Sequence, residues 1–215
     1  MTESRTGPET LSREILLIVG AMLLYFGVRN LTAGSAAAAR ANGDRVAELE
    51  SKLGFAYEHG LQDRVVGNAS LVDAANWVYV WGHWPVILTV AAVLFLTRRS
   101  DYLLLRNAMF VSGALGFLFF ALLPVAPPRL MDLGLVDTVS ERSGAYRTLQ
   151  PPGLTNQFAA LPSLHAGWNL LVGIALLWAF RNPIARAFAL VSPVAMALAV
   201  VVTANHYVID VWAGW

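Results

Sequence analysis

The segment Leu161-Pro-Ser-Leu-His165 combines a histidine with the pattern of a helix start. Pro162 and Ser163 directly precede an apolar run, and serine caps a helix by accepting a hydrogen bond from a backbone N–H. The N–H groups of a first helical turn and the positive end of the helix dipole favour a bound anion such as phosphate, with His165 beside it. Taken alone, the segment fits a capped membrane helix with an interfacial histidine equally well.

A second histidine and an aspartate lie four residues apart near the end of the sequence. On a helix, His206 and Asp210 share a face and can touch. A carboxylate on one imidazole nitrogen fixes the tautomer and leaves the other nitrogen free as a nucleophile or base. Because ionisable groups in a membrane segment are costly, the pair indicates function. The alternative is a structural His–Asp hydrogen bond between helices.

Three other side chains could contact a phosphorylated substrate. Arg129 follows two prolines, and its planar guanidinium could bind two phosphate oxygens at once. His83 lies one turn after Tyr79 and could hydrogen-bond a substrate head group. The structural alternatives are an arginine that extends to the interface and an interfacial belt of aromatic residues.

The composition predicts that these residues are positioned by membrane helices. Of 215 residues, 57% are hydrophobic and 13% are charged, whereas soluble domains average about 45–50% and about 25%. We predict one all-α domain over residues 1–215, a polytopic helical bundle of about six transmembrane helices. The net charge of +1 gives no basis for nucleic-acid binding, and the lack of cysteine excludes disulfides and thiolate chemistry.

The predicted spans follow the apolar runs. They are an N-terminal span that begins at 15–28 and extends toward residue 39, then 71–96, 102–123, 163–180 and 184–203, and a sixth that begins at His206 and is incomplete at Trp215. Either the chain is truncated there or the natural protein continues.

Two segments between the spans are not apolar. Residues 40–67 mix charges with a helical apolar pattern, which predicts an amphipathic helix at the membrane interface. Residues 124–162 hold six of the ten prolines and are predicted to form a loop. Arginines gather instead in the short loops between the second and third spans and between the fourth and fifth. Basic short loops face the cytoplasm, so we expect the 124–162 loop, His165 and His206 on the extracytoplasmic face.

The order and placement of these motifs resemble the type-2 phosphatidic acid phosphatase superfamily. The similarity is closest to the branch of inositol phosphorylceramide synthase and related inositol phosphotransferases, whose second motif looks like residues 162–165 and whose third looks like residues 206–214. The segment 50–62, with Asn76, Tyr79, His83 and Pro85, also looks like the actinobacterial-type members. We therefore expect an integral protein of a bacterial plasma membrane.

The resemblance implies a catalytic scheme that needs no metal and no cofactor. In that scheme His206 attacks phosphorus and becomes a phosphohistidine, and Asp210 orients it. His165 protonates the departing oxygen and then deprotonates the acceptor, while Arg129 and the helix start at Ser163 bind the phosphate oxygens. The further predicted substrate contacts are His83, Tyr79, Asn205, Tyr207 and Arg147.

The chain departs from the classical phosphatase pattern at two cationic positions. That pattern has a lysine before the first-motif arginine and an arginine six residues before the third-motif histidine. Here residues 122–128 contain no lysine and position 200 is Val200. This favours the transferase branch and leaves a shortage of cations that Arg29, Arg142 or Arg147 could supply.

We therefore predict a metal-independent lipid phosphotransferase that moves an inositol-phosphate or related head group. Its partners are a lipid within the membrane and a soluble polyol acceptor. The alternative within the superfamily is a phosphatase that hydrolyses a lipid phosphate or polyprenyl phosphate. Two other classes stay open, a metalloenzyme with His165, His206 and Asp210 as ligands and a transporter that uses the histidines as a proton relay. The sequence does not identify the donor lipid, the acceptor, protein partners or the oligomeric state.

Overall fold

The computed structural model describes residues 12–21, 23, 35–142 and 156–215, and it is helical throughout, which confirms the all-α prediction. A helical segment at 12–21 is followed by α2 (Ala36–Leu53), α3 (Glu58–Val66), α4 (Ala69–Trp81), α5 (Trp84–Thr97), α6 (Arg99–Leu122), the 3₁₀ turn η1 (Pro128–Leu130), α7 (Thr138–Arg142), α9 (Leu164–Ala179), α10 (Pro183–Val202) and α11 (Val208–Gly214). Among the described residues, β pairing is limited to an isolated bridge between Val125 and Ala159.

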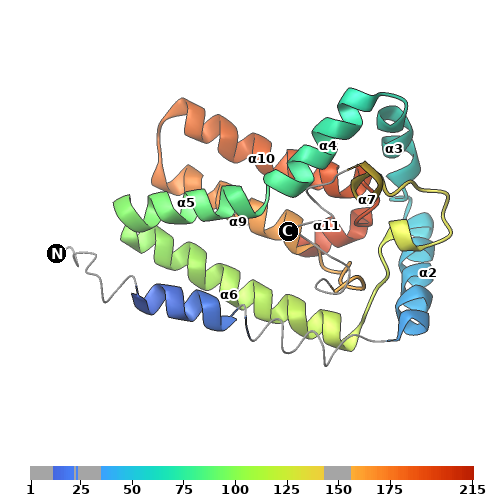
Figure 1. Cartoon of the computed structure of the whole chain (residues 1–215), viewed down its shortest axis with the longest axis horizontal. Helices are drawn as coiled ribbons and strands as arrows, with labels where there is room; N and C mark the ends of the chain where they lie inside the picture. The colour runs from blue at the N-terminus through green and yellow to red at the C-terminus, as the bar shows by residue number, and fades with distance from the viewer. Residues whose placement is uncertain (1–11, 22, 24–34, 143–155) are drawn as a thin grey trace.

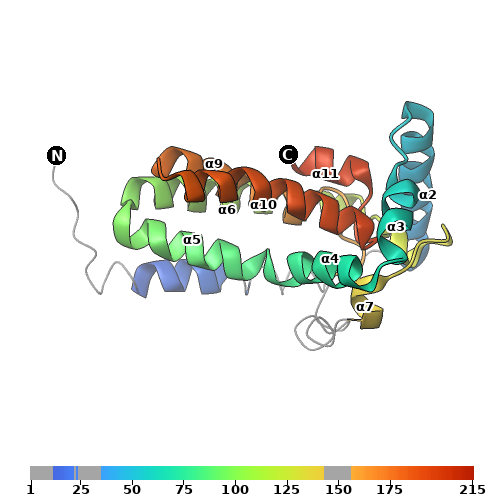
Figure 2. The ribbon, with the colours of Figure 1, turned by 90° about the horizontal axis from the view of Figure 1, so that it is seen from above.

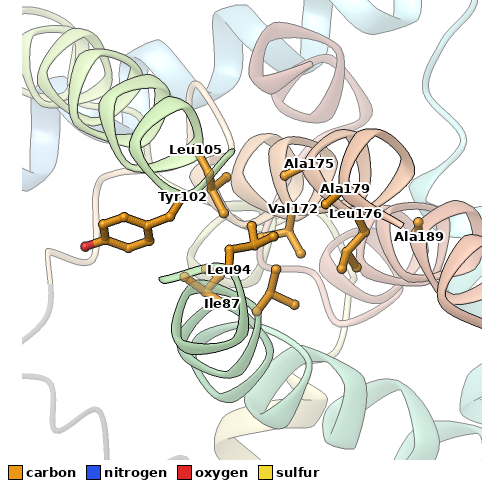
Figure 3. Close-up of a cluster of buried hydrophobic side chains, with 10 residues drawn as sticks. Ile87, Leu94, Tyr102, Leu105, Val172, Ala175, Leu176, Ala179 and Ala189 are labelled. Carbon is orange, nitrogen blue, oxygen red and sulfur yellow. The ribbon is translucent and has the colours of Figure 1, made fainter. Parts of the chain in front are cut away.

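The long helices α5, α6, α9 and α10 lie side by side and form a bundle (Figures 1 and 2). Side chains from all four helices meet in one buried cluster, in which Leu94 of α5 and Val172 of α9 are completely buried (Figure 3). Small residues allow close contact between α9 and α10, because a Cβ at Gly173 would collide with the backbone of Ala189. Close packing at small residues is the usual source of helix association in a membrane.

The predicted count of about six spans is not supported. Two described helices, α6 and α10, are long and apolar enough to cross a membrane, and the bent pair α4–α5 makes a third if it counts as one span. The apolar helix α9 has 16 residues, about 24 Å at 1.5 Å per residue, which is less than the hydrocarbon thickness of about 30 Å. The sixth run contains only the seven-residue helix α11. The predicted N-terminal span falls partly outside the described residues, so this comparison covers the other runs.

The predicted span 71–96 is two helices, α4 and α5, which meet at an angle of 45°. The break lies at Gly82 and His83, and α5 begins with Trp84 and Pro85. Proline suits the first turn of a helix, where its missing N–H leaves no hydrogen bond unmade. The break turns His83 into the interior, where it is 4% exposed.

The predicted interfacial helix at 40–67 is also two helices. α2 ends at Gly54, which has a left-handed backbone with φ of 74° and whose N–H bonds back to the last turn. Glycine adopts this conformation without steric cost, and the chain therefore turns into α3. Figure 2 shows α2 lying crosswise to the bundle at one end, and its placement at a membrane interface stays a prediction.

The described part of the 124–162 segment is a loop with short helical turns, as predicted. It contains η1 and α7, and residues 143–155 lie outside the described residues. The loop, α2, α3 and α11 gather at one end of the bundle, while the α5–α6 and α9–α10 turns lie at the other (Figure 1). At that second end the Arg98 guanidinium lies 5.8 Å from the centre of the Phe180 ring, so the two basic loops are neighbours.

Candidate active site

His206 lies in a tight turn between α10 and α11. The preceding Ala204 has a left-handed backbone with φ of 57°, an uncommon conformation for a residue with a side chain and one that clusters at functional sites. The backbone N–H groups of Asn205 and His206 both donate to the Val200 carbonyl at 3.0 Å. The expectation that His206 and Asp210 share one helix is therefore wrong, because α11 begins only at Val208.

The turn nevertheless brings the His206 and Asp210 side chains together. His206 Nδ1 lies 3.3 Å from Asp210 Oδ2 and 2.8 Å from the Ala160 carbonyl oxygen. A carbonyl only accepts, so Nδ1 carries the hydrogen and donates it, and the neutral ring has its lone pair on Nε2. Asp210 Oδ2 also accepts from the Tyr207 backbone N–H at 2.8 Å, and Asp210 is completely buried.

His165 lies in the first turn of α9, where the predicted Ser163 cap is confirmed. The Ser163 hydroxyl accepts from the Ala166 N–H at 3.3 Å, and the Ser163 N–H donates to the Asp210 carbonyl at 2.9 Å. The two histidine motifs are thus joined through the backbone, and the ring centres of His165 and His206 are 5.9 Å apart. The Ser163 side chain is buried, and the hydrogen bond of its hydroxyl is the one from the Ala166 N–H in the first turn of α9.

Two glycines permit the contact between the histidine motifs. A Cβ at Gly167 of α9 would collide with the Gly214 carbonyl of α11, and a Cβ at Gly214 would collide with the Ser163 carbonyl. The backbones of α9 and α11 therefore approach directly, without side chains between them. This approach sets the spacing between His165 and His206.

Arg129, in the proline-rich loop, is hydrogen-bonded to the turn that carries His206. Its Nε donates to the Asn205 side-chain oxygen at 3.0 Å, and its backbone N–H donates to the Ala204 carbonyl at 2.8 Å. One terminal nitrogen lies 3.5 Å from Asp137 Oδ2, which balances its charge. The guanidinium is therefore held next to His206 through Asn205, the residue that directly precedes it.

Tyr79 and His83 lie beside His165 rather than at the periphery. The Tyr79 ring stacks on His165 with centres 4.8 Å apart, and the His83 ring centre is 4.2 Å from that of His165. Tyr207 differs, because it is 1% exposed and packs in a hydrophobic cluster with Val46 and Val125, which gives it a packing role. Arg147, Arg29 and the side chain of Arg142 lie outside the described residues.

Sequence reasoning missed three polar residues that support the site. Asn169 of α9 donates to His83 Nδ1 at 3.2 Å, and its position four residues after His165 could have pointed to it. Glu50 of α2 accepts from the Ile209 N–H at 2.6 Å, and Glu58 of α3 accepts from the Val208 N–H at 2.9 Å. Nothing in the sequence signals these two contacts, which bridge 159 and 150 residues.

In the part of the chain that the structure describes, no group of three or more His, Cys, Asp or Glu side chains is placed to hold a metal ion. His165, His206 and Asp210 do not converge as a ligand set. Asp210 instead directs its bonded oxygen to His206 and to the Tyr207 N–H.

A buried imidazole with a fixed tautomer, next to a second imidazole and an arginine, suits transfer of a phosphate ester at the end of a helical membrane bundle. This is the class of protein that the fold and the site indicate, a membrane enzyme that acts on phosphate groups. The family model described as PAP2 superfamily matches residues 44–215, and the chain belongs to this superfamily. The protein is therefore a membrane enzyme of the phosphatase and phosphotransferase type. Neither the curated proteins nor the solved structures contain a significant match to the chain.

Proposed function

We propose that the protein is a metal-independent lipid phosphotransferase that works through a phosphohistidine at His206. The observation that carries this proposal is the 2.8 Å hydrogen bond from His206 Nδ1 to the Ala160 carbonyl. It leaves the Nε2 lone pair of a neutral ring available for attack, which is the requirement for a histidine nucleophile.

In the first half-reaction, Nε2 of His206 attacks phosphorus and the bond from phosphorus to the lipid oxygen breaks. The bond electrons remain with that oxygen, and His165 donates a proton to it, so the diacylglycerol leaves as a neutral alcohol. His206 becomes positively charged at the imidazole, and the buried Asp210 carboxylate at 3.3 Å stabilises that charge.

In the second half-reaction, His165 removes a proton from an acceptor hydroxyl. The acceptor oxygen attacks phosphorus and the phosphorus–nitrogen bond breaks, which returns the lone pair to His206. Arg129, held through Asn205, and the first turn of α9 offset the negative charge on the phosphate oxygens in both steps.

One observation, the residue at position 200, supports an alcohol rather than water as the acceptor. The residue six positions before His206 is Val200, completely buried, and its carbonyl binds the turn that carries His206. The classical phosphatase pattern has an arginine at this position. The proposal therefore follows the inositol phosphotransferase branch, with an inositol-phosphate or related head group transferred, and hydrolysis of a lipid phosphate is the second candidate.

The proposed location is the outer face of a bacterial plasma membrane. The site lies at the end of the bundle opposite to the neighbouring basic loops, and basic loops remain in the cytoplasm. The donor would be a lipid of the outer leaflet that enters between helices, and a polyol acceptor would arrive from outside the cell.

The test is to incubate the purified protein with labelled phosphatidylinositol, phosphatidic acid and polyprenyl phosphate, each with and without free inositol or a lipid alcohol. Transfer of label to the added alcohol, with an acid-labile phosphoenzyme that is absent in His206→Ala, is expected. Release of inorganic phosphate from phosphatidic acid without transfer would favour the phosphatase. Near-normal turnover by His206→Ala would overturn the mechanism.

A further inference from the structure

His165 belongs to a series of four aromatic rings: Tyr79 and His83 contact it directly, at interplanar angles of 17° and 33°, and Trp168 contacts His83. Besides the Tyr79 and His83 contacts at 4.8 and 4.2 Å, the His83 ring is nearly parallel to Trp168, with an interplanar angle of 9° and centres 5.9 Å apart. Such contacts use the faces of the His165 ring and leave the edge, which carries both nitrogens, for the substrate.

Hydrogen bonds fix this series of rings at His83. The Asn169 side-chain nitrogen donates to the His165 carbonyl at 3.0 Å, so this atom is the amide nitrogen rather than the oxygen. The same nitrogen lies 3.2 Å from His83 Nδ1, which must therefore accept. Neutral His83 carries its proton on Nε2. Asn169 and His83 are both buried, so the bond is shielded from water.

Trp168, the ring farthest from Tyr79, is hydrogen-bonded to α6. The Trp168 indole N–H donates to the Ser112 hydroxyl of α6 at 3.1 Å. The Trp84 ring meets the edges of both His83 and Trp168, with centres 5.3 and 5.6 Å away. Tyr79 and His83 thus contact His165 directly, and Trp84, Trp168 and Ser112 hold His83 from behind.

We propose that Tyr79 and His83 are positioning residues that hold the imidazole of His165 by ring contacts, stacked for Tyr79 and tilted by 33° for His83, with its edge toward the oxygen that leaves phosphorus. The sequence pointed to both as substrate contacts, but their ring faces are in contact with His165. The inference rests on the proposed function, in which His165 is the general acid. Two physical reasons connect these contacts to that role. Proton transfer requires the donor within hydrogen-bond reach of the leaving oxygen, and a tyrosine face attracts a cationic ring such as protonated imidazole.

The experiment uses two donors that differ in their need for a general acid. Phosphatidylinositol releases an alkoxide, which must be protonated, whereas 4-nitrophenyl inositol phosphate releases a stable phenolate. The first turnover of each donor is measured on the full chain for Tyr79→Leu, His83→Ala and the ring-preserving Tyr79→Phe. His165→Ala is the reference for a missing acid.

The expected result is a loss that depends on the leaving group. Tyr79→Leu and His83→Ala should lower the first-turnover rate on phosphatidylinositol by about 10- to 100-fold, a part of the 10²–10⁴ that general acid catalysis supplies. Their rates on the nitrophenyl donor should change less than about threefold, because no proton is needed. Tyr79→Phe should resemble the wild type on both donors.

Three outcomes would overturn the inference while leaving the proposed function intact. Equal losses on both donors would show a structural role, and a loss of first-turnover rate that disappears at saturating donor concentration would show substrate contacts. A Tyr79→Phe variant as impaired as Tyr79→Leu would show that the hydroxyl, not the ring, matters. By contrast, full turnover by His206→Ala, or no wild-type turnover of either donor, would overturn the proposed function itself.

Discussion

At the residue scale, His206 has two acceptors for one hydrogen. The Ala160 carbonyl is the nearer, at 2.8 Å, and the Asp210 carboxylate lies at 3.3 Å. Main chain alone is therefore enough to fix the tautomer. The role left for Asp210 is electrostatic, since a buried carboxylate stabilises the cationic ring that forms on attack.

This division of roles predicts a moderate effect of Asp210→Asn. The Ala160 carbonyl still holds Nδ1–H, so the tautomer remains, but the countercharge is lost. We expect kcat to fall by about 10²-fold, a change of about 2.7 kcal/mol in activation free energy. Turnover and thermal unfolding are measured together, and a loss below about tenfold in a folded variant would show that Asp210 is peripheral to the chemistry.

A second prediction at this scale concerns metal removal. In the proposed mechanism Arg129 and the first turn of α9 carry the phosphate charge, so the chemistry needs no Lewis acid. Turnover should survive prolonged treatment with EDTA. If EDTA abolishes turnover and a divalent ion restores it, the metalloenzyme alternative takes precedence.

Residue types and spacing predicted much of the site, and the reason is local. The helix-start pattern before His165 predicted its position in the first turn of α9. The four-residue spacing predicted that His206 and Asp210 touch, and they do, although His206 precedes α11. Glu50 could not be found this way, because its partner is the Ile209 backbone N–H, and a backbone group has no sequence signature.

At the element scale, α2 and α3 support the start of α11. Glu50 and Glu58 accept hydrogen bonds from Ile209 and Val208, the first residues of that helix, and both are buried. Burial, together with the neighbouring Glu58 carboxyl, raises the pKa of Glu50 to about 9. The raised pKa favours the protonated form of Glu50 at neutral pH. The interfacial helices thus help to position the turn that carries His206.

The raised pKa of Glu50 predicts a pH-dependent stability. The folded pKa of about 9 exceeds the ordinary value of 4.5, so the folded state binds the proton more tightly than the unfolded state. This contribution is complete below about pH 4.5 and is lost as pH rises through about 9. Glu50→Gln keeps the acceptor oxygen without a titrating group.

The Tm of Glu50→Gln should accordingly exceed that of the wild type by a growing margin between pH 6 and pH 9. Differential scanning fluorimetry in detergent measures both proteins at each pH. Lys52→Gln, which removes an exposed charge on the same helix, is the matched control. Parallel Tm curves for the wild type and Glu50→Gln would mean that the Glu50 carboxyl titrates normally.

The helix break at His83 shows why some elements escaped prediction. Residues 71–96 are mostly apolar, with Asp73 and Asn76 near the start, and hydropathy therefore indicates one span. The signals for two helices are local, Gly82 followed two residues later by Trp84-Pro85. His83 lies at this break, directly before α5, and its ring contacts His165.

At the scale of the whole molecule, the two basic loops and the candidate active site lie at opposite ends of the bundle. The α5–α6 and α9–α10 turns, which carry basic residues, lie at one end (Figure 1). The 124–142 loop, the start of α9 and the α10–α11 turn, which carry Arg129, His165 and His206, lie toward the other. Since α9 reaches about 24 Å, its first turn, with His165, would lie near head-group depth if its other end reaches the opposite surface. Composition could predict this polarity, because loop arginines are visible in the sequence. It did not predict how the apolar run at 71–96 divides into α4 and α5, because the break depends on the local residues Gly82 and His83.

The polarity predicts which side of the membrane the site faces. Ser100 lies exposed at the start of α6, and Asp132 lies exposed beyond η1, at the opposite end of the bundle. Because the chain has no cysteine, Ser100→Cys and Asp132→Cys each introduce one unique thiol. A membrane-impermeant maleimide on intact spheroplasts should label position 132 and spare position 100, whereas detergent should expose both. Labelling of position 100 alone would place the site in the cytoplasm, where soluble phosphate donors could reach it. The His206 chemistry would stand in that case, but the substrate pool would be an inner-leaflet lipid or a soluble phosphate ester.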